Sequence, residues 1–265
     1  MKRQESTELQ ILKLQTGTMR LGIKGVSPMI FHAMSQKGWE QLLLPRGKMT
    51  AADKATNIKH DPITEYRNSV YASVGDDAPT RLIFPAAAFK KAMMTAALRI
   101  PGMKKTEIGQ LVWVGGKYVD VYGIPELLMS VVRSADINRT PDIRTRAIVP
   151  NWACSLSVTY VRPQLGDKQI GNLLAAAGMI AGVGDGRQEK GAMNFGQFEI
   201  VAEDDAEFKA IIKNGGRVPQ DRALETPQPH DLETERMLTW YLTETEKMGD
   251  KIPAMKSKRS LHAVA

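Results

Sequence analysis

The chain has 265 residues, 43% of them hydrophobic, so it can bury a core and is not a disordered tract. Its one cysteine, Cys154, excludes an internal disulfide and an all-cysteine zinc site, and we expect neither a metal nor a cofactor. The formal net charge is +7, but four cations among the last fifteen residues leave only +3 for the rest. Bulk charge alone therefore says little about partners.

The N-terminal residues are charged and then alternate in polarity, with no apolar run of signal-peptide length. No stretch of about 18 consecutive apolar residues occurs anywhere in the chain. We therefore expect no membrane association and a cytoplasmic location.

Residues 8–14 and 18–26 alternate apolar with polar residues, which predicts a pair of half-buried strands. The segment 29–44 has the apolar stripe of a helix, and the polar residues 45–60 predict a loop. At 81–99 a short apolar strand meets Pro85, which suits the first turn of the helix that follows.

The second half of the chain continues the mixture of strands and helices. Two alternating runs flank Gly115-Gly116 and predict a two-residue hairpin turn. The polar segment 134–150 predicts a protruding loop before a core strand at 152–161. Residues 167–182 predict a helix that runs into the glycines, and a strand is predicted at 194–201.

Apolar patterning weakens beyond residue 201. Residues 204–216 predict a short helix, 217–230 a proline-rich linker, and 232–247 an amphipathic helix that docks on the body or on a neighbouring copy. A basic tail predicts disorder. We therefore divide the chain into a domain at 1–215, with an insert at about 115–150, and a C-terminal part at 216–265.

Charge is unevenly distributed along the chain. Between residues 78 and 106 there are six basic residues, including Lys90 and Lys91, and no acidic one. A field of one sign attracts phosphate groups. Lys90 and Lys91 are therefore candidate phosphate contacts.

A glycine-rich stretch at 178–200 joins a predicted helix to a predicted strand. It contains six glycines together with Arg187 and Lys190, and exposed amides beside such cations can hold phosphates. The stretch lacks the GK[ST] ending of a Walker motif, and its order of helix then loop excludes a dinucleotide fingerprint. A plain helix cap followed by a turn is the structural alternative.

The pattern G-V-G-x-x-R-x-x-x-G followed by F-G-x-F-E-I resembles the signature loop of the RAMP superfamily, the CRISPR effector proteins with a ferredoxin-like core. The resemblance covers about two dozen residues, and it is nearest to backbone subunits that polymerise along guide RNA and to phage-encoded relatives. It implies an α+β fold with a ferredoxin-like or RRM-like core, a thumb-like hairpin from the insert, and a C-terminal helix. The matching loop positions, which would lie against an RNA backbone, are Gly182, Gly184, Arg187, Gly191 and Gly196.

An arginine cluster precedes the core strand that begins at Trp152. Guanidinium groups bind phosphate in bidentate fashion, and an aromatic ring can stack on a base, although Trp152 itself is expected in the core. Acidic neighbours favour the alternative of a solvated surface. The cluster consists of Arg133, Arg139, Arg144 and Arg146.

These features predict a non-catalytic protein that binds RNA or single-stranded DNA largely without sequence preference, as a homo-oligomer or filament along the strand and with further effector subunits as possible partners. One alternative is a phage protein that coats or anneals single-stranded DNA. Another is an RNA-processing nuclease that uses His32, or an acid such as Asp76 or Asp142. A third is a structural phage assembly protein.

Overall fold

The computed structural model describes residues 13–34, 36–43, 60–75, 77–133, 141–190 and 193–248. Most of the predicted strand at 8–14, nearly all of the loop at 45–60 and the basic tail lie outside these residues, as do Asp76, Arg139 and Gly191.

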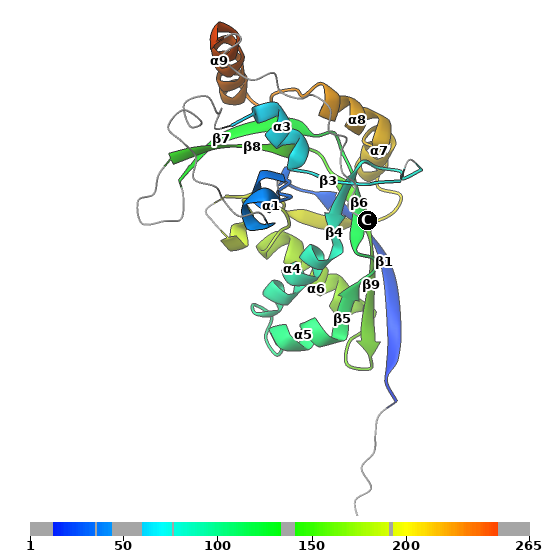
Figure 1. Cartoon of the computed structure of the whole chain (residues 1–265). Helices are drawn as coiled ribbons and strands as arrows, with labels where there is room; N and C mark the ends of the chain where they lie inside the picture. Colours follow the sequence, from blue (N-terminus) through cyan, green and yellow to red (C-terminus); the bar gives the residue numbers. More distant parts are fainter. Residues whose placement is uncertain are drawn as a thin grey trace, which may run out of the picture.

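An antiparallel sheet of seven strands forms the centre of the molecule (Figure 1). Its longest pairing joins β1 to β9, from Gln15↔Arg162 to Lys24↔Ala153. The strands follow the order β10-β1-β9-β6-β4-β3, and β5 pairs with β9 beside β6. Their bounds are β1 (Gln15–Gly25), β3 (Tyr71–Ala72), β4 (Leu82–Pro85), β5 (Val112–Val114), β6 (Tyr118–Tyr122), β9 (Ala153–Arg162) and β10 (Phe198–Val201).

Two helices, α4 (Ala86–Ala97) and α6 (Asp167–Ile180), pack together on one face of this sheet, and α5 (Lys105–Leu111) follows α4 (Figure 1). Buried side chains recur at helical spacing, with Phe89 and Met93 on α4 and Ile170 and Leu173 on α6. The predicted strand, proline and helix at 81–99 are confirmed.

A smaller sheet follows the order β2-β8-β7, with β2 (Met29–Ile30), β7 (Glu126–Arg133) and β8 (Pro141–Val149). Strands β7 and β8 pair over eight positions and project from the body (Figure 1). The prediction of a protruding loop at 134–150 is wrong from residue 141 on, because Pro141–Val149 pairs with β7 as a strand. The helix α3 (Pro62–Asn68) packs on β8, and the Ser69 hydroxyl accepts a hydrogen bond from Ala147 N at 2.8 Å.

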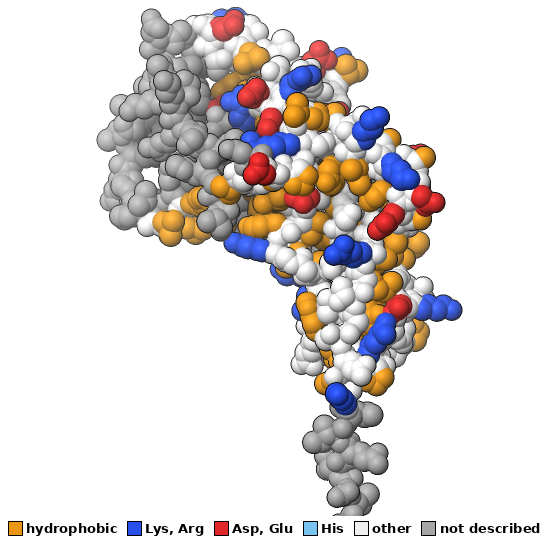
Figure 2. Space-filling model, turned by 90° about the vertical axis from the view of Figure 1, so that its right-hand side faces the viewer, with side chains coloured by type: hydrophobic (Ala, Val, Ile, Leu, Met, Phe, Trp, Pro, Cys, Tyr) orange, Lys and Arg blue, Asp and Glu red, His pale blue; other side chains and the backbone are white. Residues whose placement is uncertain are grey.

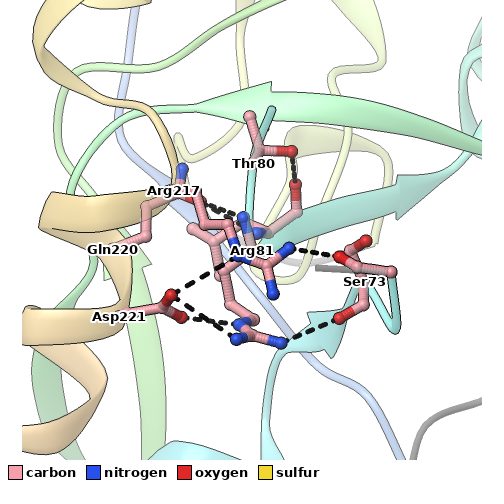
Figure 3. Close-up of polar contacts among 8 residues, drawn as sticks. Ser73, Thr80, Arg81, Arg217, Gln220 and Asp221 are labelled. Carbon is pink, nitrogen blue, oxygen red and sulfur yellow. Dashed lines mark hydrogen bonds and ion pairs between the residues drawn. The ribbon is translucent and has the colours of Figure 1, made fainter. Parts of the chain in front are cut away.

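Three helices end the described chain: α7 (Ala206–Asn214), α8 (Arg217–Glu225) and α9 (Leu232–Met248). The prediction of a linker at 217–230 is wrong for its first part, because α8 is anchored by the fully buried Gln220 (Figure 3). Its Oε1 accepts from Arg81 N and Leu82 N at 2.7 and 2.9 Å. The predicted amphipathic helix is present as α9 and packs on β7.

Two further predictions of local structure are wrong. The segment 29–44 begins as β2, and only its second part forms the helix α1 (Gln36–Leu43), because Met29 and Ile30 pair with β8. The glycines at 115 and 116 do not turn a hairpin. Instead β5 and β6 both pair with β9, so 112–122 forms one interrupted strand whose partner is distant in sequence.

The α+β class is confirmed. Among the described residues, no helix is long and apolar enough to cross a membrane. Trp152 is fully buried, as expected for the start of a core strand.

Candidate nucleic-acid interface

The glycine-rich loop between α6 and β10 folds against the protein itself. Val183 N donates to Gly196 O at 2.9 Å, and Gly196 N donates to Pro28 O at 2.8 Å. Gly196 has a φ of 71°, and a Cβ there would lie 1.7 Å from Val183 O. Glycine is therefore required at this position so that two segments of the loop can pass each other.

The loop is also tied to the small sheet. Asp185 N donates to Ile30 O at 3.0 Å, and a Cβ on Gly184 would lie 2.7 Å from the same carbonyl oxygen. The amides of Val183, Asp185 and Gly196 are thus used within the protein. Any contact of this loop with a ligand would come from its other groups.

An ion pair joins the loop to the hairpin. Arg146 of β8 donates to the Asp185 carboxylate, and the Arg146 side chain is only 13% exposed. Arg144, two residues earlier on the same strand, is exposed, and no described carboxylate forms an ion pair with it. Arg146 therefore positions the loop, while Arg144 presents its guanidinium to solvent.

A second set of contacts joins the loop to α4. Arg187 donates to Gly184 O at 2.8 Å and pairs with Glu189 at 3.1 Å, and the other Glu189 oxygen accepts from the Thr95 hydroxyl at 3.0 Å. Lys91 is exposed one helical turn before Thr95, on the same side of α4. The contacts of the loop thus extend from β8 to α4.

His32 lies near Arg146 and Asp185, in the segment after β2. Partial burial and the nearby Arg146 lower the pKa of His32, with a smaller lowering from Arg144 and an opposing effect of Asp185. Burial also lowers the pKa of Arg146, against the attraction of Asp185. The electrostatic field around His32 is therefore net positive despite the Asp185 carboxylate.

We call this region the loop junction and define it by Lys91, Arg144, Arg146, Asp185, Arg187 and His32. Four of the predicted site residues, Lys91, Arg144, Arg146 and Arg187, belong to the loop or to the strand and helix that contact it. Two other predicted cations lie elsewhere. Lys90 lies on a different side of α4 from Lys91, and Arg133 lies toward the tip of the hairpin, opposite Pro141. Gly182 and Gly184 form the packed base of the loop, and Lys190 ends the short helix η1 (Gln188–Lys190).

Sequence reasoning missed Asp185 and Thr95. No pattern in the sequence shows that the partner of Asp185 is Arg146, 39 residues earlier. Of the charges in the basic segment 78–106, Arg81 is neutralised by Asp221 at 2.6 Å. The described residues contain no group of three or more His, Cys, Asp or Glu side chains that could hold a metal ion.

No protein-family model and no curated protein matches the chain. Among solved structures, it is similar to a chain of the Type III-B Cmr-beta structure bound to cognate target RNA, with 13% identity and a TM-score of 0.37 over 70% of this chain and 59% of that one. It is also similar to Cmr6 from Pyrococcus furiosus, with 10% identity and a TM-score of 0.35 over 71% and 98% of the two chains.

Proposed function

We propose that the chain binds single-stranded nucleic acid, with RNA as the first candidate, through phosphate contacts at the loop junction. The observation that carries this proposal is that cations lie on two sides of the glycine-rich loop, which itself contains Arg187. Arg144 is two residues from Arg146, which binds Asp185, and Lys91 is one helical turn from Thr95, which binds Glu189. Cations grouped on one surface supply affinity that depends little on base sequence. The ion pair between Arg146 and Asp185 supports it by holding the loop against β8.

The order of elements supports a finer proposal about the fold. Strands β10, β1, β9 and β5 are adjacent in that order, and α4 and α6 pack on one face. We assign β1, α4, β5, β9, α6 and β10 to a ferredoxin-like core, with β7 and β8 as the thumb. Several protomers would then line one strand of nucleic acid, each contributing its own loop junction.

The test is a fluorescence-polarisation titration of labelled single-stranded RNA at several salt concentrations. We expect the affinity to fall steeply with salt, and Arg144→Ala or Lys91→Ala to reduce the slope of log K against log salt by about one each. The matched control is Arg222→Ala, which removes an exposed arginine on α8. Binding that is absent, or that is equally sensitive to the control, would overturn the proposal.

The same titration separates the alternatives. Equal binding of DNA and RNA of one sequence would favour a single-stranded DNA protein, since the 2′-hydroxyl would then contribute nothing.

We propose that the chain is not a nuclease, and incubation of labelled RNA with the protein and with His32→Ala tests this. Cleavage lost in the variant would make His32 a catalytic residue and reverse that part of the proposal. High-order oligomers that form without nucleic acid would favour an assembly protein.

A further inference from the structure

Among the described residues, part of the outer face of the large sheet is exposed to solvent. Helices α4 and α6 cover the inner face, and α7 covers only the outer end near Gly22, where a Cβ would lie 3.2 Å from the Phe208 ring. Toward the Gln15 end of β1, the outward residues Thr16, Thr18 and Arg20 are exposed. Figure 2 views this side, which is the right-hand side of Figure 1 where α7 lies.

The strand register places an aromatic ring, hydroxyl groups and a cation side by side on this surface. Trp113 of β5 is opposite Thr159 of β9, which is opposite Thr18 of β1, and the two threonine hydroxyls are 3.0 Å apart. In the adjacent row, Ser157 is opposite Arg20. We call these five residues the open sheet face. Trp113 is 40% exposed although it is the central residue of its strand.

Charge on these strands has one sign. Strands β1, β5 and β9 contain Arg20, Lys24 and Arg162 but no aspartate or glutamate. Lys24 and Arg162 are paired with carboxylates of other elements, whereas Arg20 has no ion-pair partner among the described residues. In Figure 2, uncharged polar side chains and backbone occupy much of the narrow lower part of the molecule, with hydrophobic, basic and some acidic side chains around them.

We infer that the open sheet face is a second contact surface for single-stranded nucleic acid, on which Trp113 stacks against a base and Arg20 contacts a phosphate. Trp113 and Arg20 are two strand spacings apart across the sheet, about 9 to 10 Å, and two residues apart along the strands, about 7 Å. The small residues between them leave a flat floor for a base. An aromatic ring stacks on any base, so the contact needs no particular sequence. The inference rests on the proposed function and extends it, because stacking requires an unpaired strand.

The open sheet face is separate from the loop junction. Thr95 of α4 binds Glu189, so the loop lies on the helix side of the sheet, whereas Trp113 points to the other side. The two surfaces would therefore hold different segments of one strand. A second copy of this chain is the competing occupant, and the absence of acidic residues from the three strands favours the anionic strand over it.

The experiment compares the full chain with Trp113→Ala, Trp113→Phe and Arg20→Ala, using a labelled oligouridylate of about 20 nucleotides and a duplex of equal length. We expect Trp113→Ala to weaken single-strand binding about tenfold, and Trp113→Phe to retain most of it. Arg20→Ala should weaken binding and reduce the salt slope by about one. The matched control is Trp240→Ala, which removes another exposed tryptophan from α9 and should change nothing.

The outcomes separate this inference from the proposed function. If Trp113→Ala and Arg20→Ala bind as the unmodified protein does while Arg144→Ala binds weakly, the open sheet face is excluded and the loop junction stands. If the unmodified protein binds neither oligonucleotide, both are overturned. A change of mass in light scattering for Trp113→Ala, with unchanged binding per protomer, would assign the surface to a protein partner and overturn the inference. Thermal melts of each variant verify folding.

Discussion

At the residue scale, the glycines of this chain serve different purposes. Gly196 crosses Val183 with a left-handed backbone, whereas Gly171 lies inside α6 with open space where a Cβ would point. We expect Gly196→Ala to destabilise the fold by at least about 2 kcal/mol, because a clash with backbone is added to a strained φ. The matched change Gly171→Ala should stabilise by about 0.5 to 1 kcal/mol, since alanine favours a helix interior.

Urea denaturation of the two glycine variants measures both effects as shifts of the unfolding midpoint. The Gly196→Ala variant should also lose binding of single-stranded RNA, because the loop junction depends on this crossing. Equal midpoints for the two variants would contradict the interpretation that the loop is held by direct packing of backbone on backbone.

The histidine of the loop junction adds a dependence on pH. Because the pKa of His32 is lowered in the folded state, the unfolded chain takes up its proton first as the pH falls. The contribution of His32 to stability is complete above its ordinary pKa of about 6.5 and is lost as the pH falls through the lower folded value. We therefore expect the loss of thermal stability between about pH 7.5 and about pH 5.5 to be smaller in His32→Gln. The measurement is the melting temperature of both proteins in both buffers, and an unchanged difference would refute the prediction.

At the element scale, α8 shows how one side chain can attach a helix to a sheet. The Gln220 amide donates to Val121 O, Gly123 O and Gly215 O at 2.8, 3.0 and 2.8 Å, and its oxygen accepts from two amides of the β4 region. Arg81 and Arg217 both pair with Asp221 beside it (Figure 3). The Gln220 side chain thus supplies the hydrogen-bond partners that these backbone groups would otherwise lack.

We expect Gln220→Ala to destabilise the protein by about 3 kcal/mol, because several buried backbone groups lose their partners at once. Gln228→Ala is the control, since that exposed side chain makes one long hydrogen bond of 3.5 Å to Thr226 O. Chemical denaturation of both variants gives the comparison. A loss below about 1 kcal/mol for Gln220→Ala would mean that water replaces the amide without cost.

Elements whose pattern is local could be predicted from the sequence. The helices at 86–97 and 167–180, the glycine loop and the strand after it all have their signals within a few residues. The predictions failed where a distant partner decides the structure. Pairing with β8 makes Met29 and Ile30 a strand, pairing with β9 makes 112–122 one interrupted strand, and the buried amide of Gln220 anchors α8. For the candidate site, the cations were predicted, but their assembly depends on Asp185 and Thr95, whose partners no spacing reveals.

At the scale of the whole molecule, the two sheets meet at one junction of three connections. The chain passes from β1 to β2 at 26–28, from β8 to β9 at 150–152, and from the glycine loop to β10 at 196–197. Val26 N donates to Gln197 O at 2.8 Å, and the Trp152 indole N–H donates to Ser27 O at 2.9 Å. The position of the hairpin relative to the glycine loop is therefore set around Trp152.

This arrangement predicts a large effect of Trp152→Phe. The indole is fully buried, packs against Phe198 with ring centroids 6.3 Å apart, and leaves room only for hydrogen on Gly25, where a Cβ would lie 2.2 Å from Nε1. Phenylalanine removes the hydrogen bond to Ser27 and leaves a cavity, so we expect the free energy of unfolding to fall by about 2 to 4 kcal/mol.

Chemical denaturation followed by far-UV circular dichroism and by fluorescence should give one coincident transition, because both sheets depend on this residue. Trp240→Phe, at a position 66% exposed, should leave the midpoint unchanged. Two separate transitions in the unmodified protein would show instead that the hairpin and the large sheet fold independently, and Trp152 would then not set the geometry of the loop junction.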